Sequence, residues 1–531
     1  MKDKKLLPNY RLIFWSILLF SLISRLLYIT GIPNGINQDE AMLSMDAWAL
    51  SQYGTDRFGT HLPVHFAAWQ TSQMSVLLGY FIVPFIKIFG FELWAIRLPL
   101  ALISTMGVAL LYLVSNKFFS REISLVIMAL GAINPWQFMQ SRWALDCNLF
   151  PHIFLLGFYL LLLGLEKRKF LYLSMIFFGL TFYCYGIAIY TVPVFLFVYA
   201  AWCLWKRQLK FKEVFISVII FALTALPEII TMALNLVGAP TIETPFFTMP
   251  LFPYSARSAD ILFMNFSFAQ LGKNIWALIT QVFLQFPDHL FNTIPAFGPL
   301  YHISIPFIFI GIMQFTKRLF QEKDLKKQTL DLALWGFLIM GIWAGIITLE
   351  VNVNRINIIF YPLIILCGYG IQFVLEKLAG WKQLIARILI AAYALCGIGF
   401  FGTYFTSFSE DIEKYFNVDF LEIVQEIDAS DNVDSLYITG NMGWQYNERM
   451  AEILTQYTCK IDALYYQELT TTTGGREVLP YSERYHFVNM EKCDFSDKDA
   501  IYVICKNELE NLPSSYSILT ENDTFLAITL N

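Results

Sequence analysis

Two adjacent carboxylates, Asp39 and Glu40, follow the first apolar stretch and open the segment DEAMLSMDAWALSQY. A carboxylate near a low-dielectric surface can act as a general base, which takes the proton of a hydroxyl group as that group attacks. In this interpretation Asp39 is the base, and Glu40 orients it or, as a nearby like charge, makes it more basic. The structural alternative is a helix cap, because Asp is common at helix N-termini and Met42, Met45 and Trp48 follow at helical spacing.

Three arginines stand where apolar segments begin or end: Arg97 in WAIRLPL, Arg142 in MQSRWALD and Arg355 in NVNRIN. A guanidinium group suits bidentate phosphate binding, so these residues are candidates for an anion site. Each can also be an interfacial anchor, and Arg142 is spaced to pair with Asp146 on one helix face. Arg25 lies inside the first apolar stretch, where a charge either serves function or extends to the interface.

The remaining candidates flank other apolar segments. Glu350 and Asn354 belong to the Asn-rich turn that also carries Arg355, and such a polar short turn favours ligand contact over anchoring. Tyr183 and Tyr185 follow a further apolar segment. We assign Glu350, Asn354, Tyr183 and Tyr185 to substrate binding, together with Arg25 and Asp146. The histidines and cysteines lack metal-ligand spacing, so the sequence predicts no metal site and leaves open whether a divalent metal assists.

The composition determines which elements must position these residues. Of 531 residues, 56% are hydrophobic and 15% are charged, which excludes a soluble protein. From Glu410 onward there are 23 acidic and 8 basic residues, a balance of −15, so the preceding part carries +10 within a chain of −5. This asymmetry predicts a membrane region with basic cytoplasmic loops, followed by an acidic domain outside the membrane.

Basic clusters mark the cytoplasmic ends of the spans and fix their number. A first, uncleaved span from the N-terminus and ten more predict a polytopic α-helical membrane protein with eleven spans. The ten are 95–114, 122–139, 149–165, 170–185, 187–205, 213–236, 301–316, 330–349, 356–375 and 383–405. Residues 74–89 are short and contain Pro84 and Lys87, which predicts an interfacial helix within an outer loop, 31–94.

The domain boundary is expected between residues 407 and 408. Residues 1–407 form the transmembrane catalytic domain, and residues 408–531 form an extracytoplasmic α/β domain. In that domain we predict helices at 418–427 and 444–457 and strands at 435–439, 461–465, 484–488, 500–505 and 525–530. It carries no motif of its own, so acceptor recognition and simple capping of the site both stay open.

The order of these segments resembles the GT-C glycosyltransferases, and among them the bacterial members related to protein O-mannosyltransferases and to the lipid A aminoarabinose transferase. The resemblance rests on INQDEAMLSMDAWALSQYGTDRFGTHLPVHFAAW, on Arg97-Leu98-Pro99, on NPWQFMQSRWALDCNLFPHIFLLGFYLLLLGL, on FYCYGIAIYTVPVFLF and on NVNRINIIFYPLIIL. It covers residues 25–193 and the late outer loop.

This resemblance implies an enzyme of the bacterial cell membrane that transfers a sugar from a polyprenyl-phosphate donor to an acceptor on the extracytoplasmic face. It implies that Asp39 is the catalytic base and that Arg97 and Arg355 hold the donor phosphate. The segment QTSQMSVLLGY departs from many relatives because it lacks their Pro-Pro, and in this region we assign Trp69 and Gln73 to substrate binding.

The expected function is therefore an inverting glycosyltransferase whose acceptor is a lipid, a glycan or a protein. The alternative is a transporter or flippase of lipid-linked sugars, in which the outer carboxylate binds but forms no glycosidic bond. A non-catalytic scaffold would leave the one-sided cluster of acids and arginines without a role.

Overall fold

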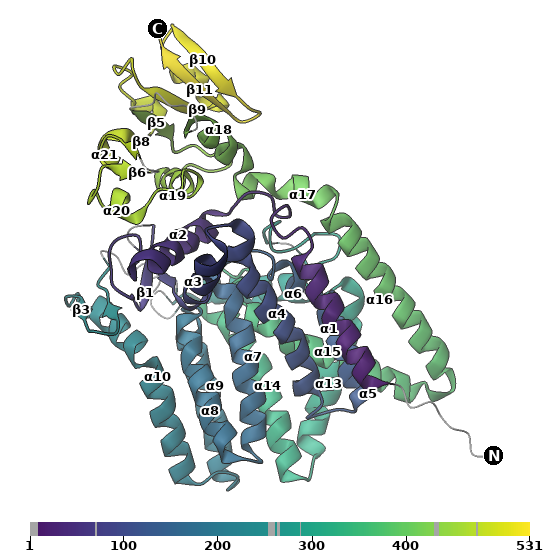
Figure 1. Cartoon of the computed structure of the whole chain (residues 1–531). Coiled ribbons are helices and arrows are strands. Elements are labelled where there is room, and N and C mark those ends of the chain that lie inside the picture. The colour runs from purple at the N-terminus through teal and green to yellow at the C-terminus, as the bar shows by residue number, and fades with distance from the viewer. Residues whose placement is uncertain are drawn as a thin grey trace. The chain divides into compact units, whose positions relative to one another are not determined.

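The computed structural model describes residues 9–69, 72–252, 261–262, 266–286, 288–428, 435–473 and 476–531 (Figure 1). The chain divides into two compact units. The first, called the helical unit here, comprises Met1–Ile29, Arg97–Ala233 and Ser255–Phe408. The second, the mixed unit, comprises Thr30–Ile96, Leu234–Tyr254 and Ser409–Asn531.

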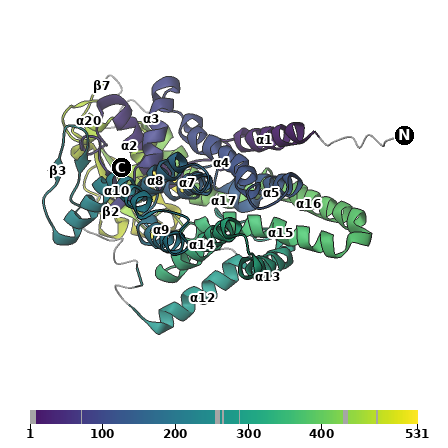
Figure 2. The same ribbon diagram turned by 90° about the horizontal axis from the view of Figure 1, so that it is seen from below.

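The helical unit is built from long apolar helices that run side by side, as Figures 1 and 2 show for α7, α8 and α9. Its helices are α1 (Tyr10–Leu26), α4 (Leu93–Ser115), α5 (Arg121–Ile133), α6 (Pro135–Met139), α7 (Phe150–Gly164), α8 (Arg168–Leu180), α9 (Ala188–Trp205), α10 (Phe211–Val237), α12 (Phe268–Val282), α13 (Ile305–Gln321), α14 (Leu325–Ile347), α15 (Phe360–Lys377) and α16 (Lys382–Tyr404). The first four residues of α4 and the last four of α10 belong to the mixed unit.

Eight helical segments in the described residues are long and apolar enough to cross a membrane. They contain α4, α7, α9, α10, α13, α14, α15 and α16. The chain is thus a multi-span membrane protein, and its mostly helical fold class agrees with the sequence. The other three predicted spans correspond to α1, α5 and α8, which have 17, 13 and 13 residues. The count of eleven therefore stays a prediction.

The predicted span at 122–139 is wrong as a single helix, because the chain breaks at Asn134. The helix α5 ends at Ile133, and the Asn134 side chain accepts a hydrogen bond from the Gln137 amide at 3.0 Å, which caps α6. Pro135 occupies the first turn of α6, where its missing N–H costs nothing. An Asn-Pro pair thus ends one helix and starts the next.

The N-terminal part of the mixed unit is a helix, a hairpin and a second helix. These are α2 (Gln38–Tyr53), the antiparallel pair β1 (His65–Ala68) and β2 (Ser72–Ser75), and α3 (Leu77–Phe89), with a short pair β3 (Ile242–Glu243) and β4 (Thr248–Met249). The expected interfacial helix at 74–89 corresponds to α3. In α2, most residues from Glu40 to Leu50 are buried, so this helix is part of the core rather than a surface helix.

The C-terminal part contains a five-stranded sheet in the order β10-β11-β9-β5-β8. Its strands are β5 (Leu436–Thr439), β8 (Tyr485–Val488), β9 (Ile501–Cys505), β10 (Tyr516–Glu521) and β11 (Phe525–Leu530). The strand β5 pairs parallel with β8 and β9, and the other pairs are antiparallel. Buried side chains of β9 and β11, with Met490, form the core of this sheet.

Helices and short elements complete this domain: α17 (Ser407–Ile412), α18 (Val418–Asp428), α19 (Glu448–Thr458), α20 (Ala463–Tyr466), α21 (Tyr481–Arg484) and the pair β6 (Thr472–Thr473) and β7 (Arg476–Glu477). The strand predicted at 461–465 is wrong, because Asp462 caps α20 by accepting from the Leu464 amide at 2.8 Å. The sequence analysis also missed β10, whose side chains are largely exposed.

Two glycines let α13 and α15 approach closely. A Cβ at Gly311 would lie 1.9 Å from the Leu366 carbonyl oxygen, and a Cβ at Gly370 would lie 1.9 Å from the Phe307 carbonyl oxygen. Small residues at such positions allow the backbones of membrane helices to pack closely. This packing matters because no hydrophobic effect drives helices together in lipid.

We expect Gly311→Ala to force α13 and α15 apart and to lower the apparent melting temperature of the purified protein in detergent. The matched control is Gly402→Ala in α16, where an added Cβ would meet no atom within 4 Å. Equal melting temperatures for the two variants would contradict this account of the packing.

Candidate functional site

The acidic pair lies in the first turn of α2, and its N-cap is Asn37. The Asn37 side chain accepts a hydrogen bond from the Asp39 amide at 3.0 Å. Asp39 is therefore not the cap, which removes the structural explanation that the sequence left open. The Asp39 side chain is half-buried, whereas Glu40 is fully buried. The amino end of a helix favours negative charge, so the position suits a carboxylate that must be ionised.

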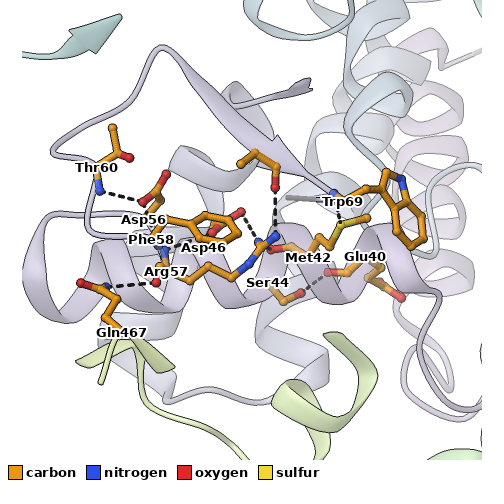
Figure 3. Close-up of polar contacts among 11 residues, drawn as sticks. Glu40, Met42, Ser44, Asp46, Asp56, Arg57, Phe58, Thr60, Trp69 and Gln467 are labelled. Carbon is orange, nitrogen blue, oxygen red and sulfur yellow. Dashed lines mark hydrogen bonds and ion pairs between the residues drawn. The ribbon is translucent and has the colours of Figure 1, made fainter. Parts of the chain in front are cut away.

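A buried ion pair between Arg57 and Asp46 lies further along α2 from this turn (Figure 3). The Arg57 Nη1 atom is 2.6 Å from Asp46 Oδ2 and also donates to the Met42 carbonyl at 3.2 Å, while Nη2 donates to the Ala67 carbonyl at 2.9 Å. One guanidinium group thus connects α2, the turn after it and strand β1. Burial raises the pKa of Asp46 above its usual value, and the Arg57 charge opposes this shift.

The C-terminal part of the mixed unit holds both ends of α2. Ahead of the helix, the Ile36 amide donates to the Phe416 carbonyl at 2.9 Å, and Asn37 Nδ2 donates to the Tyr415 carbonyl at 3.3 Å. At its far end, the Tyr53 hydroxyl donates to Asp462 at 2.7 Å. The C-terminal domain therefore belongs to the framework that positions Asp39.

The same domain contacts the segment ahead of the hairpin β1–β2 and the hairpin itself. Gln467 Nε2 donates to the Arg57 carbonyl at 3.0 Å, and Arg449 donates to the carbonyl of Trp69. Trp69 follows β1 with a positive φ of 54°, and its amide meets the Met42 sulfur at 3.4 Å. Gln73 lies in β2 opposite Ala67. The two predicted substrate contacts, Trp69 and Gln73, thus share one hairpin.

Three fully buried arginines gather where α1 ends, in the helical unit. Arg142 donates to the carbonyl oxygens of Ser24, Arg25 and Tyr28 at 2.8–3.1 Å and to the Tyr404 hydroxyl at 3.1 Å. Arg97 donates to the Ile29 carbonyl at 2.9 Å. The last carbonyls of a helix lack intrahelical donors and carry partial negative charge, so Arg142 stabilises this end. Arg97 instead holds the turn that follows the helix.

Arg25 is held within the same region. Its guanidinium donates to the Ser21 carbonyl at 2.9 Å, to the Ala132 carbonyl and to Gln137, and it lies 5.7 Å from the centre of the Phe138 ring. The side chain is fully buried within the protein. These contacts attach α1 to the break between α5 and α6.

The turn between α14 and α15 brings Glu350 and Arg355 together. Arg355 Nη1 donates to the Thr348 hydroxyl and to the Glu350 carbonyl, both at 3.1 Å, and Nη2 lies 3.8 Å from the Glu350 carboxylate. The Arg355 side chain is 22% exposed, in contrast to Arg97 and Arg142. Asn354 Oδ1 is buried and makes no hydrogen bond within the described part of the chain.

The helix α12, which the sequence analysis missed, fixes this turn. Gln270, Asn274 and Gln281 donate to the carbonyls of Leu349, Thr348 and Val351, with distances of 2.6 and 2.7 Å for the two glutamines. Their spacing of four and seven residues places them on one helix face. The amides in FAQLGKNIWALITQV were therefore the signal that could have revealed this helix.

The remaining predicted residues lie in the helical unit. Asp146 opens a 3₁₀ turn and accepts from the Cys147 amide at 2.7 Å. The Tyr183 hydroxyl donates to the Thr224 carbonyl at 2.9 Å, and Tyr185 is half-buried. No cluster of three or more potential metal ligands occurs among residues the structure describes.

The structure thus places the predicted residues in two groups. Asp39, Glu40, Trp69 and Gln73 belong to the mixed unit, whereas the arginines and the other candidates belong to the helical unit. The sequence analysis missed Arg57 and Asp46, because a charged pair eleven residues apart gives no sign of burial.

Comparison with known proteins identifies the fold. Residues 74–230 match the family model for dolichyl-phosphate-mannose-protein mannosyltransferases. The chain resembles ArnT from Cupriavidus metallidurans bound to undecaprenyl phosphate, with a TM-score of 0.59 and 12% identity over 98% of this chain and 97% of that one. It also resembles the Archaeoglobus fulgidus oligosaccharyltransferase in the apo form, with a TM-score of 0.55 and 10% identity over 94% and 70%.

No curated protein sequence matches the chain. At these identities the structural likeness shows the fold, which is that of ArnT. Together with the family match, it confirms the resemblance to the GT-C glycosyltransferases that the sequence indicated.

We expect Asp46→Asn to lower the free energy of unfolding by about 3–5 kcal/mol, because it leaves the Arg57 charge buried without its partner. Thermal unfolding of the purified protein would show this as a lower melting temperature. Glu521→Gln is the control, since it breaks a pair with Lys506 that is 37% and 56% exposed, and such pairs contribute little. A melting temperature equal to that of the control would contradict the role given to Arg57.

Proposed function

We propose that this protein is an integral membrane glycosyltransferase that moves a sugar from a polyprenyl-phosphate donor to an extracytoplasmic acceptor, with inversion. The observation that carries the proposal is the likeness of nearly the whole chain to ArnT, whose structure holds undecaprenyl phosphate, a lipid of the donor's class. The family match to mannosyltransferases that use a dolichyl-phosphate sugar supports the same chemistry. We place the site on the extracytoplasmic side of a bacterial cell membrane, because the basic clusters lie at the opposite ends of the spans.

In the proposed reaction, an acceptor hydroxyl attacks the anomeric carbon on the face opposite the phosphate. A new bond forms between that carbon and the acceptor oxygen, and the bond from the carbon to the phosphate oxygen breaks. The polyprenyl phosphate leaves with the electron pair, and Asp39 takes the proton of the hydroxyl group. No redox partner is required, and a divalent metal is not part of the proposal.

The surroundings of Asp39 support its role as the base. It is half-buried, it does not cap its helix, and its position is held by Asn37 at one end of α2 and by the Arg57 network below. A base needs such positioning because proton transfer depends on hydrogen-bond geometry first. Glu40 is buried beside it and serves as a positioning residue.

Arg355 is the arginine best suited to the donor phosphate. Its guanidinium is partly exposed and sits on a turn fixed by α12, so it is preorganised for a negative leaving group. Arg97 and Arg142 are buried against the carbonyls at the end of α1, which favours a supporting role for both. The Asn354 oxygen next to Arg355 is buried and has no hydrogen-bond partner among the residues that the structure describes, which supports a substrate contact by this turn.

We expect Asp39→Asn to reduce release of free polyprenyl phosphate by about 10²–10⁴-fold, because the variant cannot accept the proton. The assay uses purified protein in vesicles with a mixed pool of radiolabelled polyprenyl-phosphate sugars. The control is Glu92→Gln, which removes a 55% exposed carboxylate from the same unit and should leave release unchanged.

Normal release by Asp39→Asn would overturn the assignment of the base. If neither the wild type nor the variant released polyprenyl phosphate, while labelled lipid moved between leaflets, the protein would be a transporter and the proposed function would be wrong.

We expect Arg355→Ala to lower the rate of donor cleavage by about 10²-fold. The variant lacks one group that stabilises the negative charge developing on the leaving phosphate. Arg355→Lys should restore part of the rate, because it keeps the charge but not the planar fork. The control is Arg387→Ala, an exposed arginine of α16. Equal rates for Arg355→Ala and the control would exclude Arg355 from phosphate binding.

A further inference from the structure

An apolar groove of about 380 Å³ lies among α7, α8, α9 and α10 of the helical unit, away from the residues discussed so far. Figures 1 and 2 show α8, α9 and α10 side by side. Lining side chains include Met175, Pro193, Ala200, Leu209 and Val218. Phe197 and Val218 line the groove and are also 74% and 56% exposed, so it opens to the hydrocarbon that surrounds the helices.

One end of this groove reaches the turn that joins α9 to α10. Leu204, from the last turn of α9, and Leu209, from the connection itself, both line it. This connection carries four cations, Lys206, Arg207, Lys210 and Lys212. In the described residues, no carboxylate lies within ion-pair distance of these four groups.

The basic end lies at the depth of lipid headgroups. The Lys206 ammonium stacks on the rings of Trp202 and Trp205, at 5.0 and 4.1 Å from their centres. Tryptophan rings mark the boundary between hydrocarbon and headgroups. A cation at this level meets the phosphate of a lipid rather than its chains.

The turn is also held in place by groups other than these cations. Arg168 donates to the Glu213 carboxylate, to the Gly164 carbonyl and to the Gln208 carbonyl, each at 2.8 Å. This neutralises Glu213 and connects the ends of α7, α8 and α10. The basic end is therefore preorganised, and the nearby Glu213 carboxylate is bound mainly by Arg168 and by the Lys210 amide, which donates to it at 2.8 Å.

A polar group inside the groove also lacks a good partner. The Tyr199 hydroxyl is buried. Within the described chain its one nearby partner is the Cys203 thiol, which is a weak hydrogen-bonding group. A buried hydroxyl group without a good partner is costly, and an ester oxygen of a glycerolipid can accept a hydrogen bond from it. The groove thus offers an apolar channel for an acyl chain, a hydroxyl donor for an ester oxygen and a cationic end for a phosphate. These are the three parts of a phospholipid.

We propose that this groove binds one anionic phospholipid, with an acyl chain among α7 to α10 and the phosphate headgroup on the cations of residues 206–212. The anionic headgroup distinguishes this lipid from the zwitterionic lipids that any apolar groove would admit, because cations near the surface attract net negative charge. The inference is independent of the sugar-transfer proposal, since it uses no residue assigned to that reaction.

The test measures lipid affinity by native mass spectrometry of the full chain in neutral detergent, with phosphatidylglycerol and phosphatidylcholine of the same acyl chains. We expect wild-type protein to bind phosphatidylglycerol about tenfold more tightly or better. The combined variant Lys206→Gln, Lys210→Gln, Lys212→Gln should lose this preference and keep its affinity for phosphatidylcholine. Ala200→Phe should weaken both lipids, because it fills the groove.

Two controls separate the groove from general effects. Lys377→Gln, Lys382→Gln, Arg387→Gln removes three charges from α15 and α16 and should keep the preference for phosphatidylglycerol. Val194→Phe fills a second apolar groove, on α9 and α14, and should change neither affinity. Equal affinity of the wild type for both lipids, unchanged binding by Ala200→Phe, or equal loss in the charge control would each overturn the proposal.

Discussion

The ion pair between Arg57 and Asp46 is the interaction on which the mixed unit depends. A single buried guanidinium group satisfies a carboxylate and a backbone carbonyl of α2 and one backbone carbonyl of β1. A charge can be buried only when all of its hydrogen-bond and ion-pair partners are in place. The arrangement of α2, the following turn and β1 is therefore restricted to one that gives Arg57 all of these partners. The first turn of α2, with Asp39 and Glu40, takes its position from this arrangement.

The C-terminal domain extends the same framework. Its backbone carbonyls at residues 415 and 416 receive donors from the chain ahead of α2, and Asp462 receives the hydroxyl of Tyr53 after it. The domain is therefore more than a cap, because it fixes the helix that carries the proposed base. This explains why a domain without a catalytic motif of its own belongs to one compact unit with residues 30–96.

In the helical unit, arginines act mainly on backbone groups. Arg142 completes the end of α1 and Arg97 holds the turn after it, where carbonyls would otherwise lack donors in a region poor in water. Arg355 differs because its turn is held from behind by the amides of α12, which leaves part of its guanidinium exposed. Residues with the same side chain thus have different roles, and burial decides between them.

The sequence by itself determined the membrane class, most of the long apolar helices, the acidic composition of the C-terminal part and the resemblance to the GT-C glycosyltransferases. These follow from composition, apolar length and the order of local motifs, which are properties of neighbouring residues. Local signals also explain the corrections, since Asn134 with Pro135 and Asp462 are caps that outweigh apolar patterning. Only the tertiary structure decided that Asn37 rather than Asp39 caps α2, that Arg57 pairs with Asp46, and that Arg97 and Arg142 are buried while Arg355 is partly exposed. The reason is physical: burial and hydrogen-bond partners depend on segments far apart in the chain, and charge alone does not reveal them.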